Sequence, residues 1–427
     1  GARSSSSIIN TKSWKDIIGN TWGGSGEVTP IGLRMQYLLG SASKNKYSDF
    51  LSPKYNPNEI YVMSSDFNRT IMSVTANLQG LYNKTTVENL TETQIKNAII
   101  PKLNNTEEIN EKIKEIENQS VKGGISLIPI RVFSKKAHEF RLTDSSFCPG
   151  ISKFKSVGEE VKRKTQELCQ LTNDTFGEYI FRFMNISGVS NPKYLMSWSV
   201  VNNICDSFIA GYVDHKDMPH IVRTGIDLEA FFEHAKVITF YNTFFYSNGD
   251  PINEVSYIAM SPVFRKMLNF MDKRINLNNK GLPDKIVPNS PRYVIISGHE
   301  STLASSGRYL NAEFGVNLTE TLYAASETYE LLKNESNGKY FIRYFFNEVE
   351  KATFDYEFFK NKILSRIYNE KEILEICEGP QEDEEDDEDK DEDDEVKVEI
   401  LVWKISFYSV LALSVICFLV CIRCCLV

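Results

Sequence analysis

The sequence has few histidines, and it lacks both the residue spacings typical of metal sites and the glycine motifs that bind nucleotides. Its five histidines show no His-x3-His spacing, and no Cys-x2-Cys pair occurs outside the last eleven residues, so no zinc-type site is predicted. A Walker loop, a dinucleotide-binding glycine motif and a Gly-x-Ser-x-Gly elbow are also absent, which argues against P-loop NTPases, Rossmann dehydrogenases and serine α/β-hydrolases. We therefore expect neither a metal ion nor a cofactor.

The chain also lacks the excess of basic charge that nucleic-acid binding requires. Its formal net charge is −9, but residues 382–395 hold thirteen acidic side chains and one lysine, a local charge of −12, so the rest sums to +3. A nearly neutral folded part predicts no nucleic-acid partner. We interpret 379–400 as a solvated, self-repelling acidic linker that holds the folded part away from a membrane.

One long hydrophobic run lies near the C-terminus. Ile405–Ile422 contains eighteen uncharged residues, which as a helix would span about 27 Å, close to a bilayer core. Trp403 and Lys404 precede the run and Arg423 follows it, as is typical of membrane interfaces. We predict a single transmembrane helix within 401–427, with a glycolipid-anchor signal as the alternative.

Glycosylation sequons and cysteines indicate the side of the membrane on which the folded part lies. All nine Asn-x-Ser/Thr sequons precede the acidic linker, at Asn68, Asn83, Asn89, Asn104, Asn118, Asn173, Asn185, Asn317 and Asn334. We expect glycans on the eight from Asn83 onward, and therefore a lumenal or extracellular location, in a lysosome-like compartment or at the cell surface. Four cysteines precede the linker, at Cys148, Cys169, Cys205 and Cys377. They suit two disulfides, whose three pairings the spacing leaves open.

Short apolar runs predict strands within an α/β fold. They are Glu59–Ser64, Ile125–Val132, Tyr293–Ser297 and Tyr340–Phe346. A helical pattern follows the first run, with apolar residues at Ile71, Val74, Leu78 and Leu81. Residues from about 145 to 280 have a mainly helical pattern. We predict a central, mostly parallel sheet flanked by helices, with an α-helical insertion.

The chain is long enough to bury a sizeable core, with 427 residues of which 42% are hydrophobic. We expect five parts along it. These are the first half of the α/β domain (1–140), a helical cap insertion (141–283), the second half of the α/β domain (284–378), the acidic linker (379–400), and the membrane helix with a short tail (401–427).

Two polar clusters follow predicted strands. Ser64–Thr70 contains Arg69, and Ser297–Leu303 contains His299. Each cluster puts a cationic side chain between the end of a strand and the start of a helix, where free backbone N–H groups also lie, and this combination suits a phosphate. Because a single arginine at a strand end more often forms a structural ion pair, these features alone indicate phosphate binding only weakly.

The residues around these clusters resemble the histidine acid phosphatase family. Ile60–Ser73 (IYVMSSDFNRTIMS) is similar to the family segment around its second phosphate-binding arginine, and Ile295–Leu303 (IISGHESTL) to its histidine–acid motif. Gly26–Arg34 and Tyr37–Gly40 resemble the family's early helix. The start, Gly1-Ala2-Arg3-Ser4, resembles the end of the Arg-His-Gly-x-Arg signature. The similar segments occur in consistent order over roughly residues 1 to 380.

The resemblance implies a two-step phosphomonoesterase that needs no metal. In this family the signature histidine attacks phosphorus and becomes a phosphohistidine, which water then hydrolyses. Carried over to this chain, Arg3, Arg69 and His299 would bind the phosphate, and Glu300 would protonate the leaving alcohol. The expected substrate is a small phosphate monoester, and a homodimer is the candidate oligomer.

Two departures from the family pattern bear on this expectation. Glu300 stands where most of these phosphatases carry aspartate, which leaves the substrate class open. The chain starts after the Arg-His of the signature, so we expect the nucleophilic histidine just upstream of Gly1. The alternative is a catalytically inactive membrane glycoprotein whose pocket binds an anion or whose surface binds a protein partner.

The resemblance also implies disulfide pairings. Cys148 is similar to a family cysteine that pairs with one near the end of the catalytic domain, here Cys377. Cys205 also resembles a family cysteine, but its usual partner falls near Ser326, where no cysteine exists. Cys169 is the expected substitute partner, unless both of these thiols are free.

Overall fold

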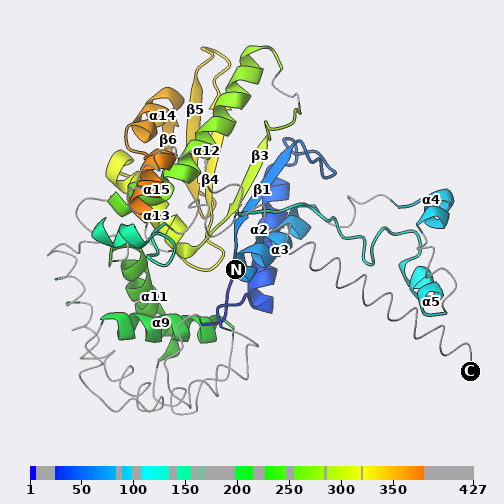
Figure 1. The fold of residues 1–427 in the computed structure, drawn as a ribbon, viewed down its shortest axis with the longest axis horizontal. Helices are drawn as coiled ribbons and strands as arrows, with labels where there is room; N and C mark the ends of the chain where they lie inside the picture. The colour runs from blue at the N-terminus through cyan, green and yellow to red at the C-terminus, as the bar shows by residue number, and fades with distance from the viewer. Residues whose placement is uncertain are drawn as a thin grey trace, which may run out of the picture. The chain divides into compact units, whose positions relative to one another are not determined.

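The structure of the chain is a computed structural model (Figure 1). It describes residues 1–5, 25–82, 89–98, 107–133, 142–154, 163, 167, 198–214, 227–246, 254–282, 286–318 and 321–378. The chain divides into a unit of Gly1–Gly379 and a second unit of Pro380–Val427. The second unit, with most of the predicted acidic linker and the whole predicted membrane helix, lies outside the described residues.

Most of the described elements are helices, and three consecutive strands occur near the C-terminal end of the described chain. In chain order the elements are α2 (Pro30–Lys46), β1 (Ile60–Ser65), α3 (Asn68–Leu81), α4 (Glu92–Asn97), α5 (Glu107–Ile116), β2 (Arg131–Phe133), the 3-10 helix η3 (Pro149–Phe154), α9 (Trp198–Val213), α11 (Leu228–Tyr241), the π-helix η4 (Asn242–Tyr246), α12 (Glu254–Asn279), β3 (Tyr293–Ser297), α13 (Glu300–Phe314), β4 (Glu327–Lys333), β5 (Tyr340–Phe346), β6 (Val349–Asp355), α14 (Tyr356–Leu364) and α15 (Glu370–Glu378). Within these described elements no helix is both long and apolar enough to cross a bilayer.

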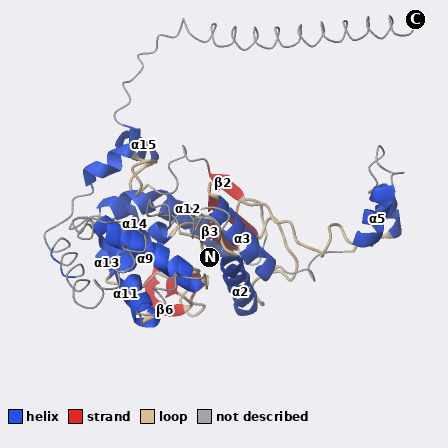
Figure 2. Cartoon of the chain, turned by 90° about the horizontal axis from the view of Figure 1, so that it is seen from below, coloured by secondary structure: helices blue, strands red, loops and turns tan. Residues whose placement is uncertain are grey.

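A parallel sheet with the order β2-β1-β3 lies at the centre of the α/β part. The register pairs Ser64 with Ser297 across β1 and β3, so both strands end at the same edge. Helix α3 packs on one face, and on the other the ring of Tyr61 lies 5.1 Å from that of Phe270 in α12. Figure 2 shows the strands between these two helices. The prediction of an α/β fold with a parallel sheet and flanking helices is therefore confirmed.

The predicted strand at Ile125–Val132 forms only in its last part. The ladder between β1 and β2 starts at Arg131, and residues 124–130 lie outside any strand. Pro129 has no N–H to donate to a ladder, which accounts for the late start of β2.

The strand at Tyr340–Phe346 is present as β5 but belongs to a different sheet. It is the middle strand of an antiparallel sheet with the order β4-β5-β6. Asn347 and Glu348, with φ of 48° and 63°, make the tight turn from β5 to β6. Such two-residue turns with left-handed backbone join antiparallel strands, so the predicted strand is confirmed but lies outside the parallel sheet.

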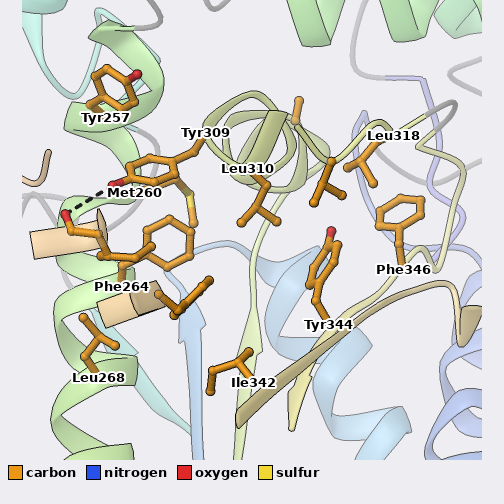
Figure 3. Close-up of a cluster of buried hydrophobic side chains, with 14 of the residues drawn as sticks. Tyr257, Met260, Phe264, Leu268, Tyr309, Leu310, Leu318, Ile342, Tyr344 and Phe346 are labelled. Atoms are coloured by element: carbon orange, nitrogen blue, oxygen red, sulfur yellow. Dashed lines mark hydrogen bonds between the residues drawn. The ribbon is translucent and has the colours of Figure 1, made fainter. Parts of the chain in front are cut away.

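A large core cluster joins α12, α13 and the antiparallel sheet (Figure 3). Tyr309 of α13 is fully buried, and its ring meets that of Phe264 of α12 edge to face at 4.9 Å. Ile342, Tyr344 and Phe346 of β5 lie on the other side of the cluster. The start of α13, which carries the second polar cluster, is thereby anchored on an aromatic core.

Helices α2 and α3 approach each other backbone to backbone. A Cβ atom at Gly40 would lie 1.9 Å from the carbonyl oxygen of Asn77, and one at Gly80 would lie 2.0 Å from that of Tyr37. No larger side chain fits at either glycine without separating the helices. This close packing holds α3, and with it the first polar cluster, against α2.

The described elements within the predicted cap insertion are helical. They are η3, α9, α11, η4 and α12, and α9 packs on α11 through the rings of Phe208 and Phe231, whose centroids are 4.1 Å apart. The boundaries proposed for the five parts of the chain stay predictions.

Cys148 and Cys377, the pair named from the sequence, form a disulfide that joins the residue before η3 to α15. Both cysteines are buried, in a cluster with Ile151, Ile258 and Ile373. Cys205 is buried in α9, whereas Cys169 lies outside the described residues. The second pairing therefore stays a prediction.

Replacing both Cys148 and Cys377 with serine should lower the free energy of unfolding by about 2–5 kcal/mol. The bridge spans 229 residues of sequence, so its loss restores much conformational freedom to the unfolded chain. Urea denaturation of the wild type and the double variant would measure the difference. Reducing the disulfide of the wild type should remove most of the difference in unfolding free energy between the two proteins. If that difference persists under reducing conditions, the bridge does not stabilise the fold.

Candidate active site

Residues 1–5 lie directly against the start of α2. The amide of Ser4 donates to the carbonyl of Glu27 at 2.8 Å, and the amide of Thr29 donates to the carbonyl of Ala2 at 3.0 Å. A Cβ atom at Gly32 would lie 2.0 Å from the Ala2 carbonyl oxygen, so only glycine permits this approach. The segment is therefore held rigidly, and Arg3 with it.

Arg3 forms a two-point ion pair with Asp206 of α9. Nη2 donates to Oδ1 at 2.7 Å and Nη1 to Oδ2 at 3.3 Å, and Nη1 also donates to the carbonyl of Ser4 at 3.1 Å. The two side chains are only 19% and 11% exposed. The guanidinium carbon lies 6.0 Å from the ring centroid of Tyr323. Burial acts to lower the pKa of Arg3, but Tyr323 and Asp206 together raise it above its ordinary value, so Arg3 stays cationic.

His299 meets the end of β1 across the parallel sheet. Its Nε2 lies 2.9 Å from Oγ of Ser65, which is also 2.9 Å from Oγ1 of Thr70. The ring of Phe67 packs edge-on against His299 at 5.0 Å, and the Arg69 guanidinium lies over the same phenyl ring at 4.5 Å. The two polar clusters identified in the sequence are thus brought together, with Arg69 and His299 both in contact with one aromatic ring.

Glu300 is the first residue of α13 and is half-buried. Its Oε1 accepts hydrogen bonds from Thr321 at 3.2 Å and Thr243 at 3.4 Å. Burial raises the pKa of this carboxyl to about 7; Arg3 and the two hydroxyls act to lower it, and Asp206 adds to the increase. A helix N-terminus favours a carboxylate, but here desolvation outweighs that effect. Below about pH 7 Glu300 therefore carries a proton that it can donate.

Two side chains at this site were not predicted from the sequence: Asp206 and Tyr323. The hydroxyl of Tyr323 is buried and has no hydrogen-bond partner among the described residues. A usable signal existed for Asp206, which is the one charged residue of the apolar helix α9, because a carboxylate in such a helix is rarely buried without a partner. Tyr323 carries no comparable signal.

Neither the other histidines nor the sequon asparagines were predicted to belong to this site. His234 is exposed on α11, and His138, His215 and His220 lie outside the described residues. The described sequon asparagines are all exposed, namely Asn68, Asn89, Asn118, Asn317 and Asn334, whereas Asn83, Asn104, Asn173 and Asn185 lie outside. Over the described ranges, no group of three His, Cys, Asp or Glu side chains could hold a metal ion.

The sequence profile of the histidine phosphatase superfamily (branch 2) matches residues 7–347. The chain belongs to this superfamily. The lysosomal acid phosphatase of Xenopus laevis is 24% identical over 331 residues, which are 78% of this chain and 64% of that protein. The human testicular acid phosphatase is 42% identical over 69 residues, 16% of each chain. The matches therefore span less than two thirds of these relatives' length, and they support membership of the histidine acid phosphatase family.

Solved structures show the same fold. The phytase from Citrobacter braakii superposes with a TM-score of 0.53 at 13% identity, over 86% of this chain and 96% of that one. At this identity the likeness establishes the architecture alone.

The raised pKa of Glu300 makes the stability of this histidine phosphatase depend on pH. A carboxyl whose pKa rises on folding, here from 4.5 to about 7, stabilises the folded state at low pH, and this contribution disappears as pH rises through 7. Relative to Glu300→Gln, the wild type should therefore lose about 1–3 kcal/mol of unfolding free energy between pH 5 and pH 8. Urea denaturation at both pH values would measure the change. A wild-type-to-variant difference that is the same at both pH values would contradict it.

Proposed function

We propose that this chain is an acid phosphatase that hydrolyses small phosphate monoesters through a phosphohistidine. The observation that carries the proposal is a carboxyl that holds its proton below about pH 7, Glu300, beside the buried cation of Arg3. A phosphatase needs both groups, one to neutralise phosphoryl oxygens and the other to protonate the leaving oxygen. Superfamily membership and the acid phosphatase relatives support the same activity.

The described residues divide the chemistry between binding and proton transfer. Arg3, Arg69 and His299 bind the phosphoryl oxygens, whose charge they neutralise in the transition state. As the nucleophile attacks phosphorus, the bond to the ester oxygen breaks and Glu300 donates its proton to that oxygen. In the second step the Glu300 carboxylate accepts a proton from the attacking water, and the nitrogen–phosphorus bond breaks to release phosphate.

The nucleophile in this proposal is a histidine immediately before Gly1. The similarity of Gly1-Ala2-Arg3 to the end of the Arg-His-Gly-x-Arg signature supports this position. The codons preceding Gly1 in the gene provide the test. Arg-His there supports the enzyme; another dipeptide favours the alternative, an inactive glycoprotein that binds an anion or a protein partner.

Arg69 and Glu300 should respond differently to substitution. Because Arg69 binds phosphate in both ground and transition states, Arg69→Ala should lower kcat/KM and weaken inhibition by orthophosphate, each by roughly tenfold or more. Because Glu300 acts only in proton transfer, Glu300→Gln should cut kcat for alkyl phosphates by roughly a hundredfold and leave orthophosphate inhibition almost unchanged. Steady-state kinetics near pH 5 would measure both effects.

Two comparisons make this test specific. The exposed Arg34 of α2 provides a matched control, since Arg34→Ala removes an arginine remote from the proposed site and should leave kinetics unchanged. The Glu300→Gln defect should shrink for nitrophenyl phosphate, whose leaving group needs little protonation. Equal losses for alkyl and nitrophenyl esters would remove Glu300 from the role of general acid.

We also propose that residues 401–427 anchor the folded part in a membrane, with that part on the lumenal side of a lysosome-like compartment or at the cell surface. The hydrophobic run Ile405–Ile422 supports the anchor, and the lysosomal acid phosphatase relatives support the compartment. Deleting every residue after Asp394 should release a soluble, glycosylated protein into the medium. Retention of the truncated protein on membranes would contradict the proposal, and release of the full-length protein by a phosphatidylinositol-specific phospholipase would indicate a glycolipid anchor instead.

A further inference from the structure

Asp206 occupies one particular edge of the Arg3 guanidinium. Its two oxygens bind Nη1 and Nη2, the end-on pair of donors, and the second Nη1 hydrogen goes to the Ser4 carbonyl. Within the described part of the chain these are the hydrogen-bond partners of Arg3. The side-on pair of donors, Nε–H and the second Nη2 hydrogen, remains for two oxygens of a phosphate. The ion pair thus determines which edge of the arginine a substrate meets.

The position of Asp206 is itself well determined. The neighbouring residue, Ser207, shares a buried hydrogen bond of 2.8 Å with the hydroxyl of Ser5. Helix α9 is therefore joined to residues 1–5 at two successive points, and its Phe208 packs on Phe231 of α11. Helix α9, about two hundred residues further along the chain, therefore holds Arg3 in position.

Asp206 also acts on Glu300 through charge. The charged groups that shift the pKa of Glu300 are Arg3 from the N-terminal segment and Asp206 from α9. Tyr323, from the loop before β4, has its own pKa raised in part by Glu300, and His299 precedes Glu300 in the chain. Alone, the buried cation of Arg3 would draw the proton from Glu300, because an opposite charge favours the ionised form. The Asp206 carboxylate offsets that cation, and it contributes to raising the pKa of Glu300.

We propose that Asp206 is a positioning residue of the phosphatase site, through which helix α9 both orients Arg3 toward the phosphate and governs proton donation by Glu300. This inference rests on the proposed acid phosphatase activity. Asp206 need not touch the substrate, since its partner Arg3 makes that contact. The Asp206 carboxylate thus lets Arg3 donate hydrogen bonds to the phosphate. At the same time its negative charge reduces the extent to which the Arg3 cation lowers the pKa of the general acid, Glu300.

The experiment compares three variants of the full-length protein across the pH range of its activity. Asp206→Asn removes the charge and one strong acceptor. Asp206→Glu keeps the charge but moves the carboxylate by one methylene, and Ser207→Ala removes the hydroxyl that contacts Ser5 next to the ion pair. The readout is kcat/KM for an alkyl phosphate as a function of pH. Its fall at high pH reports the loss of the Glu300 proton.

Each variant has a distinct expected result. Asp206→Asn should move the fall in kcat/KM to lower pH by roughly 0.5 to 1 unit, and should lower the plateau by roughly tenfold because Arg3 loses its orientation. Asp206→Glu should lower the plateau and leave the pH of the fall unchanged. Ser207→Ala should change neither. An unshifted fall in Asp206→Asn, or an equal shift in Ser207→Ala, would overturn the proposal, because Asp206 would then serve only to attach the helix.

A second measurement is independent of turnover. The difference in unfolding free energy between wild type and Glu300→Gln changes with pH as Glu300 titrates, and the midpoint of that change can be measured. The same measurement is then made in the Asp206→Asn background, by comparing Asp206→Asn with the double variant Asp206→Asn/Glu300→Gln. The midpoint should lie roughly 0.5 to 1 pH unit lower in the Asp206→Asn background, and an unchanged midpoint would overturn the inference. A wild-type protein without phosphatase activity would instead refute the proposed function, and this titration would still decide the role of Asp206.

Discussion

The parallel pairing of β1 with β3 is the constraint on which the candidate site depends. Parallel strands end at the same edge of a sheet, so pairing Ser64 with Ser297 puts the two following polar segments side by side. One segment carries Arg69 and the other carries His299 and Glu300, although more than two hundred residues separate them in sequence. The contact between Ser65 and His299 at 2.9 Å follows from this register. A slip by one residue would reverse the faces on which these side chains lie.

Buried aromatic and glycine packing keeps that edge in place. Helix α3 is held because its C-terminal half touches α2 through Gly40 and Gly80. Helix α13 is held because Tyr309 packs within the core around α12 and β5. Neither arrangement contributes a group to the chemistry. Both limit the movement of helix starts whose free N–H groups and side chains face the same place, and such preorganisation is what electrostatic catalysis requires.

The electrostatic character of the site depends on a balance between burial and charge. Burial alone raises the pKa of a carboxyl and favours its uncharged form. A buried arginine beside that carboxyl lowers its pKa and favours the ionised form. Here Arg3, Asp206 and Glu300 share one partly desolvated region, and the result is a persistent cation beside an acid whose pKa lies at about 7. Loss of the negative charge of Asp206 would shift this balance in favour of the ionised Glu300.

Local patterns in the sequence identified the elements and residue types that short-range physics controls. The apolar periodicity after Arg69 predicted α3, and the runs at residues 59–64 and 293–297 predicted the two strands that pair in parallel. Such predictions are possible because the pattern of apolar residues in a segment reflects which of its faces is buried. The similarity of the polar clusters to a known family then indicated Arg3, Arg69, His299 and Glu300. Tertiary structure decided what no local pattern encodes: that β5 pairs in a separate antiparallel sheet, that Asp206 reaches Arg3 from a distant helix, and that Glu300 is desolvated enough to hold a proton. Such contacts depend on which segments meet in space, and the burial and charge that set a pKa exist only once those segments have met.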